Sequence, residues 1–116
     1  LHLTVRSNDM MLGNPHDTAG FALLAHFLAE KVGVDVGFLT VSISNAHIYD
    51  IHFEQAQAII DRECESGGIM FECPKNAFDR AEVGDGDSEE LVQECFEQLK
   101  EKYVPQESLG RMSIVL

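Results

Sequence analysis

The chain has little positive charge. Among its 116 residues, 8 are Lys or Arg and 20 are Asp or Glu, which gives a formal net charge of -12. This charge repels polyanions, and the sequence has no basic stripe, so DNA, RNA and anionic membranes are not expected as general partners. An anionic ligand could bind only where positively charged side chains outweigh this negative charge locally.

Long apolar runs are also missing. Residues 21–28 form one of the longest, but this run is shorter than the roughly 20 residues that a bilayer requires, and His26 interrupts it. We therefore expect no membrane-spanning helix, and no signal peptide is visible. A chain of 116 residues can bury about two-thirds of its unfolded surface around one core. One domain, or part of one, is expected.

Cysteine is scarce, and its three positions are Cys64, Cys73 and Cys95. An odd number at wide spacing argues against a disulfide scaffold and favours a reducing, cytoplasmic location. No Cys-x-x-Cys pair is present and the histidines show no metal-ligand spacing, so no metal site is expected. All three thiols are interpreted as packed side chains.

Apolar periodicity predicts an α/β chain that opens in a strand. Strands are predicted at residues 1–6, 38–49 and 68–73. Helices are predicted at residues 18–32, at residues 50–65 and from residue 87 onward. Because the chain opens at Leu1 within a strand, we expect a further segment to precede it in the intact protein.

The connections are less regular. Residues 7–17 are predicted to form a structured loop, and Asp17 or Thr18 is the expected N-cap of the first helix. Residues 75–87 have no clear period and are also predicted as loop. Residues 112–116 are apolar, and we expect a last strand or a closing segment there.

Two pairs of polar residues stand at strand positions. Arg6 and Ser7 follow the first strand, and a guanidinium beside a hydroxyl can grip a phosphate. His47 and Tyr49 are two residues apart, so they project to the same face of a strand and can hydrogen-bond a sugar hydroxyl. Plainer interpretations also exist, because Arg6 with Asp9 could be a surface ion pair and His47 with Tyr49 could be core residues.

Several short motifs, in the same order and at the same spacing, resemble the C-terminal half of thymidylate synthase. The family pattern runs Arg-Ser-x-Asp, Leu-Gly-x-Pro-Phe-Asn, a helix with Ala-Leu-Leu, and His-x-Tyr-x-x-His. The resemblance is dense over residues 1–57 and weaker afterwards, where Tyr103-Val104-Pro105 is similar to a near-terminal Tyr-x-Pro. The matching segments here are Arg6-Ser7-Asn8-Asp9, Leu12-Gly13, Pro15-His16-Asp17, Ala22-Leu23-Leu24, and Asn45-Ala46-His47-Ile48-Tyr49 with His52.

The resemblance implies a nucleotide site and a folate site. In this interpretation Arg6 and Ser7 contact the 5′-phosphate of a pyrimidine nucleoside monophosphate. His47 and Tyr49 bind the deoxyribose 3′-hydroxyl. The cofactor would be 5,10-methylenetetrahydrofolate, and the residues that would line its pocket are Asp9, Leu12 and Gly13.

Asp17 departs from the synthase pattern, which has Asn facing the pyrimidine. An amide offers a donor and an acceptor and so complements uracil, whereas a carboxylate offers acceptors to the exocyclic amino group of cytosine. The wrong polarity at a buried edge costs about 1–3 kcal/mol. Asp17 therefore favours a cytosine nucleotide, and the chain resembles the deoxycytidylate hydroxymethylases, although Asp17 could also act simply as a helix cap.

His16 is a second departure, because synthases place Phe beside the folate at this position. A synthase reduces an exocyclic methylene on the pyrimidine ring with hydride from the folate, whereas a hydroxymethylase adds water to it. An imidazole can hold or activate that water, while a phenyl ring excludes it. The candidate catalytic residues are His16, which would hold this water, and Asp17, which would stabilise the charge that spreads over the cytosine amidine.

The nucleophile of the family is absent from this sequence. It is a Cys in a Pro-Cys-His setting before the strand on which this chain opens, and no such motif occurs here. The family also takes phosphate-binding arginines from a partner subunit. The resemblance thus implies a homodimer in which this chain supplies part of a nucleotide pocket.

We therefore expect an α/β (α+β) fold of the thymidylate synthase type, with a mixed sheet and packed helices, in which residues 1–116 form the C-terminal part of one domain. The expected activity is that of a pyrimidine nucleotide hydroxymethylase acting on carbon 5 of dCMP or CMP. Two alternatives are a thymidylate synthase-like methylation or hydroxymethylation of dUMP and a non-catalytic nucleotide-binding fragment.

Overall fold

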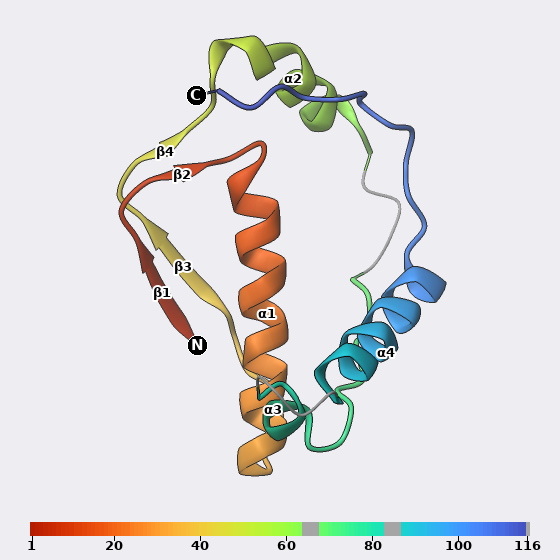
Figure 1. Cartoon of the computed structure of the whole chain (residues 1–116). Helices are drawn as coiled ribbons and strands as arrows, with labels where there is room; N and C mark the ends of the chain where they lie inside the picture. The colour runs from red at the N-terminus through yellow and green to blue at the C-terminus, as the bar shows by residue number, and fades with distance from the viewer. Residues whose placement is uncertain (64–67, 83–86, 116) are drawn as a thin grey trace.

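The computed structural model describes residues 1–63, 68–82 and 87–115. It has an α/β arrangement in which short strands lie along one side of a long central helix, and three further helices lie at its two ends (Figure 1). The elements in chain order are β1 (His2–Val5), β2 (Asn8–Asp9), α1 (Gly13–Val32), β3 (Thr40–Ile43), β4 (Ala46–His47), a 3-10 turn (Asp50–His52), α2 (Phe53–Asp61), α3 (Ala77–Arg80) and α4 (Asp87–Lys102). The predicted fold class is confirmed.

The strands form two parallel pairs. β1 pairs with β3, and β2 pairs with β4, with Asp9 opposite His47. Two backbone hydrogen bonds of 3.0 Å, from Ser44 N to Val5 O and from Asn8 N to Asn45 O, link the first pair to the second. Both parallel pairs are connected through α1, as parallel strands require a long crossover. The end of the β1–β3 pair is thereby joined to the start of α1 through β2.

Helix α1 begins five residues earlier than predicted, at Gly13. Its N-cap is Leu12, which has no capping side chain, so the expectation that Asp17 or Thr18 caps this helix is wrong. Pro15 fits in the first turn because the amides there have no intrahelical partner. Asp17 consequently lies inside the helix. The other end agrees with the sequence, since Gly33 adopts φ 72° and closes the helix.

The segment at residues 68–73 does not form the predicted strand. Its backbone is paired with a side chain of α4 instead: Glu72 N donates to Gln98 Oε1 at 2.6 Å, and Gln98 Nε2 donates to Glu72 O at 2.9 Å. The Gln98 amide takes the place of a neighbouring strand. Residues 112–115 likewise contain no strand.

One helix prediction and one loop prediction need correction. Residues 50–65 were expected to form one helix, but the segment opens as a 3-10 turn and α2 ends at Asp61. Residues 64–67, including Cys64, lie outside the described part of the chain. The predicted loop at 75–87 contains α3, a helix of four residues. The helix predicted to begin at Asp87 is confirmed as α4.

The apolar core is small and lies where the C-terminal half of α1 meets α3 and α4. Its buried residues are Ala77, Leu91 and Cys95, and Phe27, Phe71 and Cys73 pack against them.

None of the 20 residues of α1 is buried, although the helix is apolar on most of its circumference. The accessible surface is 9059 Å² for a chain of 12.9 kDa, whereas a self-contained globular chain of this mass has about 6,300 Å². Much apolar surface on α1 is therefore uncovered.

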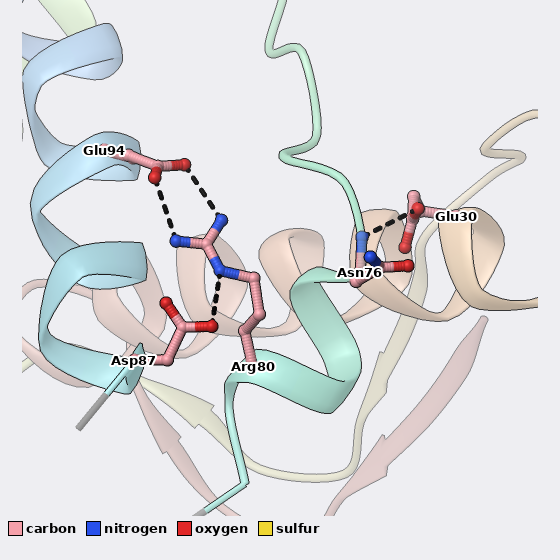
Figure 2. A network of polar contacts seen from close by, with 5 residues as sticks. All are labelled: Glu30, Asn76, Arg80, Asp87 and Glu94. Carbon is pink, nitrogen blue, oxygen red and sulfur yellow. Dashed lines mark hydrogen bonds and ion pairs between the residues drawn. The ribbon is translucent and has the colours of Figure 1, made fainter. Parts of the chain in front are cut away.

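Ion pairs reinforce this core. Arg80 of α3 donates to both carboxylate oxygens of Glu94 in α4, at 2.9 and 3.0 Å, and its Nε donates to Asp87 at 3.0 Å (Figure 2). Asn76 N donates to Glu30 Oε1 at 3.0 Å, and Lys31 contacts the carboxylate of Asp79. These contacts tie α3 to both α4 and the C-terminal end of α1.

No helix in the described ranges has the length and apolar character needed to cross a membrane.

Candidate functional site

Most of the residues singled out from the sequence lie where β2, β4 and the N-terminal end of α1 meet (Figure 1). β2 is only two residues long and leads directly into the turn before α1, so its side chains stand beside the first turns of the helix. β4 brings the His47 region alongside β2 through the parallel pairing. The site thus combines segments that are nearly 40 residues apart in sequence.

Asn8 and Asp17 form the central contact of this region. Asn8 is 5% exposed, and its Nδ2 donates to Asp17 Oδ2 at 2.8 Å. Gly13 lies beside them, because a Cβ at this position would be 3.8 Å from Asn8 Oδ1 and 3.9 Å from Asp17 Oδ2. Asp17 remains exposed to solvent. The amide of Asn8 therefore fixes one carboxylate oxygen of Asp17 and leaves the other oxygen open.

Asn8 was not predicted as a site residue. Its Oδ1 is buried and has no hydrogen-bond partner among the described residues. A buried acceptor without a partner is rare in proteins and calls for an explanation. The sequence held a signal for it, since Asn8 stands within the Arg6-Ser7-Asn8-Asp9 string, but nothing in that string reveals the contact with Asp17.

Asp9 orders the turn between β2 and α1. Its Oδ1 accepts hydrogen bonds from Met11 N at 2.9 Å and from Leu12 N at 3.4 Å, and its other oxygen bonds to no described residue. Met10 N donates to His47 O at 2.9 Å, which fastens the same turn to β4. Asp9 ends β2, Leu12 is the N-cap of α1 and Gly13 is the first residue of this helix, and the pocket that they were expected to line stays a prediction.

His47, Tyr49 and His52 form a row of aromatic rings. The His47 and Tyr49 centroids are 5.3 Å apart and those of Tyr49 and His52 are 6.3 Å apart, both edge to face at 88°. His47 Nδ1 lies 3.3 Å from Asn45 O, and because a carbonyl only accepts, this nitrogen carries the proton in that contact. The rings of His47 and Tyr49 do lie together, but the predicted continuous strand over residues 38–49 is wrong, because β4 ends at His47 and Tyr49 follows it.

Arg6 and Ser7 lie at the junction between the two strand pairs. The Ser7 hydroxyl accepts a hydrogen bond from Asn45 Nδ2 at 3.3 Å. Arg6 is exposed, and within the described ranges its guanidinium has no ion-pair or hydrogen-bond partner. An exposed cation of this kind is available to an anion in a chain that is otherwise strongly acidic.

His16 lies in the first turns of α1 and is exposed. Its Nδ1 is 2.8 Å from the carbonyl oxygen of Leu12, so Nδ1 carries a proton and donates it in this bond. In the neutral ring, Nε2 is then an acceptor that faces away from the backbone contact. The ring can accept a hydrogen bond from a water molecule through this atom.

The described cysteines lie apart from this region, in the core between α1, α3 and α4. Burial raises the pKa of the Cys73 thiol, with a further contribution from the Glu30 carboxylate, and burial also raises the pKa of Cys95. A thiol that stays protonated is a poor nucleophile. The interpretation of these two as packed thiols is confirmed.

Within the described ranges, no group of three His, Cys, Asp or Glu side chains could hold a metal ion.

The family model for thymidylate synthase matches residues 1–98, which include every element from β1 into α4. No solved structure matches the chain. The match covers the β2, β4 and α1 segments that build the candidate site. The chain therefore belongs to the thymidylate synthase family, a family of one-carbon transferases in nucleotide biosynthesis.

Proposed function

We propose that this protein is a pyrimidine nucleotide hydroxymethylase that transfers a one-carbon unit from methylenetetrahydrofolate to carbon 5 of dCMP or CMP. The observation that carries the proposal is the carboxylate of Asp17, held at the N-terminal end of α1 by the buried amide of Asn8 at 2.8 Å. A carboxylate in this place sets which pyrimidine edge can bind.

The hydrogen bond from Asn8 leaves one carboxylate oxygen of Asp17 as an acceptor for the base. Oδ2 of Asp17 accepts from Asn8, while Oδ1 bonds to no described residue. Oδ1 can accept a hydrogen bond from the exocyclic amino group of cytosine. The carbonyl that uracil has there would face a second acceptor instead, at a cost of about 1–3 kcal/mol or roughly 5- to 150-fold in Kd.

The other nucleotide contacts follow from charge and chemistry. The Arg6 guanidinium can form paired hydrogen bonds to a 5′-phosphate, with the Ser7 hydroxyl as a further donor. His47 and Tyr49, one ring against the other, offer polar atoms to the 3′-hydroxyl. In the proposed complex the nucleotide extends from Arg6 at the strand junction to Asp17 on α1.

The turn between β2 and α1 fits a folate. The Asp9 oxygen that bonds to no described residue can accept from N–H groups of a pterin, and Gly13 has no side chain to occupy the space beside Asp9. When bound, the folate supplies the one-carbon unit. His16, through Nε2, is proposed to hold the water that completes the hydroxymethyl group.

The attacking thiol must come from outside the described residues, because the pKa values of Cys73 and Cys95 are raised and both pack in the core. We propose that a preceding segment of the intact protein supplies it, and that the protein is a homodimer in which the partner contributes further phosphate contacts. The uncovered apolar surface of α1 supports this proposal, since Phe21, Leu24 and Leu28 are exposed on it and an exposed apolar patch commonly marks an interface. A cytoplasmic location is part of the same proposal.

Isothermal titration calorimetry of the intact protein with dCMP and with dUMP tests the substrate class. We expect dCMP to bind more tightly by about 5-fold or more, because the uracil carbonyl lacks a donor for the Asp17 carboxylate. Mass analysis of the product after adding methylenetetrahydrofolate then distinguishes a hydroxymethyl from a methyl group. Tighter binding of dUMP would refute the proposal.

Two other functions have specific support. A thymidylate synthase-like reaction on dUMP is favoured by the family match itself. A non-catalytic nucleotide-binding fragment is favoured by the lack of a Pro-Cys-His motif in this sequence. Nucleotide binding without any turnover by the intact protein would support the second of these.

A further inference from the structure

His52 is the largest fully buried side chain of the described residues, with 1% of its surface exposed. It ends the 3-10 turn Asp50–His52, and its backbone N–H donates to Tyr49 O at 2.9 Å. Tyr49 is thus bound to His52 through the backbone and also contacts its ring edge to face. The position of Tyr49 depends directly on the position of His52.

The His52 ring also makes one long-range hydrogen bond. Its Nε2 lies 2.9 Å from the carbonyl oxygen of Ser113, which is 61 residues further along the chain. A carbonyl only accepts, so Nε2 carries the proton and donates. This bond attaches residues 112–115 to the 3-10 turn, and the C-terminal segment runs back across α2 toward the end of β4 (Figure 1).

The second ring nitrogen explains why this bond matters. Nδ1 is buried and has no hydrogen-bond partner among the described residues. An unpaired buried nitrogen is unfavourable, and a phenyl ring would fill the same space without one. The imidazole is therefore accounted for by what Nε2 gains at Ser113 and not by packing alone.

We propose that His52 is a positioning residue that fastens the C-terminal segment, residues 112–115, to Tyr49 and so couples this segment to the sugar end of the nucleotide site. The link runs from Ser113 through the His52 ring to Tyr49 and on to His47. The part of the proposal that concerns the nucleotide rests on the proposed function. The attachment of the segment by His52 does not depend on it.

Limited trypsin digestion of the intact protein tests the attachment. Cleavage after the exposed Arg111 reports opening of the C-terminal segment, and cleavage after the exposed Lys75, in another region, reports general unfolding. His52→Phe keeps a ring against Tyr49 but loses the bond to Ser113. We expect cleavage after Arg111 to become about fivefold faster, the ratio that corresponds to one ordinary hydrogen bond, with no change at Lys75.

His52→Gln is the conservative variant, because its amide can still donate to the Ser113 carbonyl, and its cleavage rate should lie close to that of the wild type. Saturating dCMP should slow cleavage after Arg111 in the wild type and have no effect in His52→Phe. If calorimetry shows no nucleotide binding, the proposed function fails, and the nucleotide-free rates still decide whether His52 holds the segment.

Three results would overturn the proposal. The first is cleavage of His52→Phe after Arg111 at the wild-type rate. The second is equal acceleration at Arg111 and Lys75, which would mean that His52 only supports the general fold. The third is binding of dCMP that leaves cleavage after Arg111 unchanged in the wild type, which would separate the C-terminal segment from the nucleotide site.

Discussion

The two ends of α1 differ in how their charges are used. At the C-terminal end, Lys31 pairs with Asp79, and Arg80 pairs with Asp87 and Glu94. At the N-terminal end, the described residues form no ion pair: Arg6 is exposed, and Asp17 bonds only to the neutral amide of Asn8. Charges that are paired within the protein stabilise it, whereas charges left unpaired remain available to a ligand. The difference identifies one end as structural and the other as the candidate site.

The largest expected effect concerns the structural end. Leu91 is 2% exposed in the core, so Leu91→Ala removes apolar contacts and leaves a cavity. We expect the free energy of unfolding, from urea denaturation, to fall by about 2–5 kcal/mol. Val92→Ala on the same helix is the matched control, because Val92 is 67% exposed, and it should change this free energy by less than about 0.5 kcal/mol.

Leu91→Ala also tests whether the two ends of α1 act independently. Under conditions where the variant is still folded, its preference between dCMP and dUMP should equal that of the wild type, since Leu91 of α4 packs beside Phe27 in the C-terminal half of α1 and does not contact Asp17. A changed preference would show that the two ends are not independent.

The second effect concerns Arg6. Arg6→Ala should weaken dCMP binding by about 1.5–3 kcal/mol, or roughly 10- to 150-fold in Kd, because a hydrogen-bonded cation is lost from the phosphate. The unfolding free energy should stay within about 0.5 kcal/mol of the wild type, since Arg6 is exposed and bonds to no described residue. Calorimetry with deoxycytidine is the control, because this ligand has no phosphate and should bind both proteins equally. If Arg6→Ala weakened the binding of deoxycytidine as much as that of dCMP, Arg6 would not act on the phosphate.

The smallest effect is the pH dependence of the structural end. The hydrogen bond from Arg80 holds the pKa of the Glu94 carboxyl below its ordinary value of 4.5. The unfolded chain therefore binds more protons, and the stabilisation is complete above pH 4.5 and is lost as the pH falls through the folded-state pKa. The urea midpoint should decrease over this range. The urea midpoint of Arg80→Gln should decrease less over the same range. If the midpoints of the wild type and the variant fell in parallel with pH, the Arg80–Glu94 pair would not contribute to stability.

The sequence predicted the local parts of this fold well. Periodicity gave β1, the body of α1 up to Gly33, and the start of α4 at Asp87. The start of α1 was missed because the turn before the helix is ordered by a side chain of the preceding strand: Asp9 accepts hydrogen bonds from Met11 N and Leu12 N, and the helix begins at Gly13 without a side-chain cap. Residues 68–73 were predicted as a strand because apolar pattern alone does not reveal that Gln98 satisfies their backbone.

The candidate site was predicted in part. The family resemblance selected residues that the structure gathers around β2 and β4, including Asp9 opposite His47. It did not reveal that Asn8 holds Asp17 or that His52 bonds to Ser113, because each contact joins positions with no local pattern between them. Such pairings depend on how distant segments meet, and only the three-dimensional arrangement gives them.

Replacing Asp17, the side chain on which the choice of base depends, is the most direct test of the proposed substrate. Calorimetry should compare dCMP and dUMP binding to the wild type and to Asp17→Asn, a variant of nearly equal volume whose amide can both donate and accept. We predict that the wild type prefers dCMP and that the variant shifts the ratio of the two Kd values toward dUMP by about 5-fold or more. An unchanged ratio would contradict the assignment of Asp17 to the base.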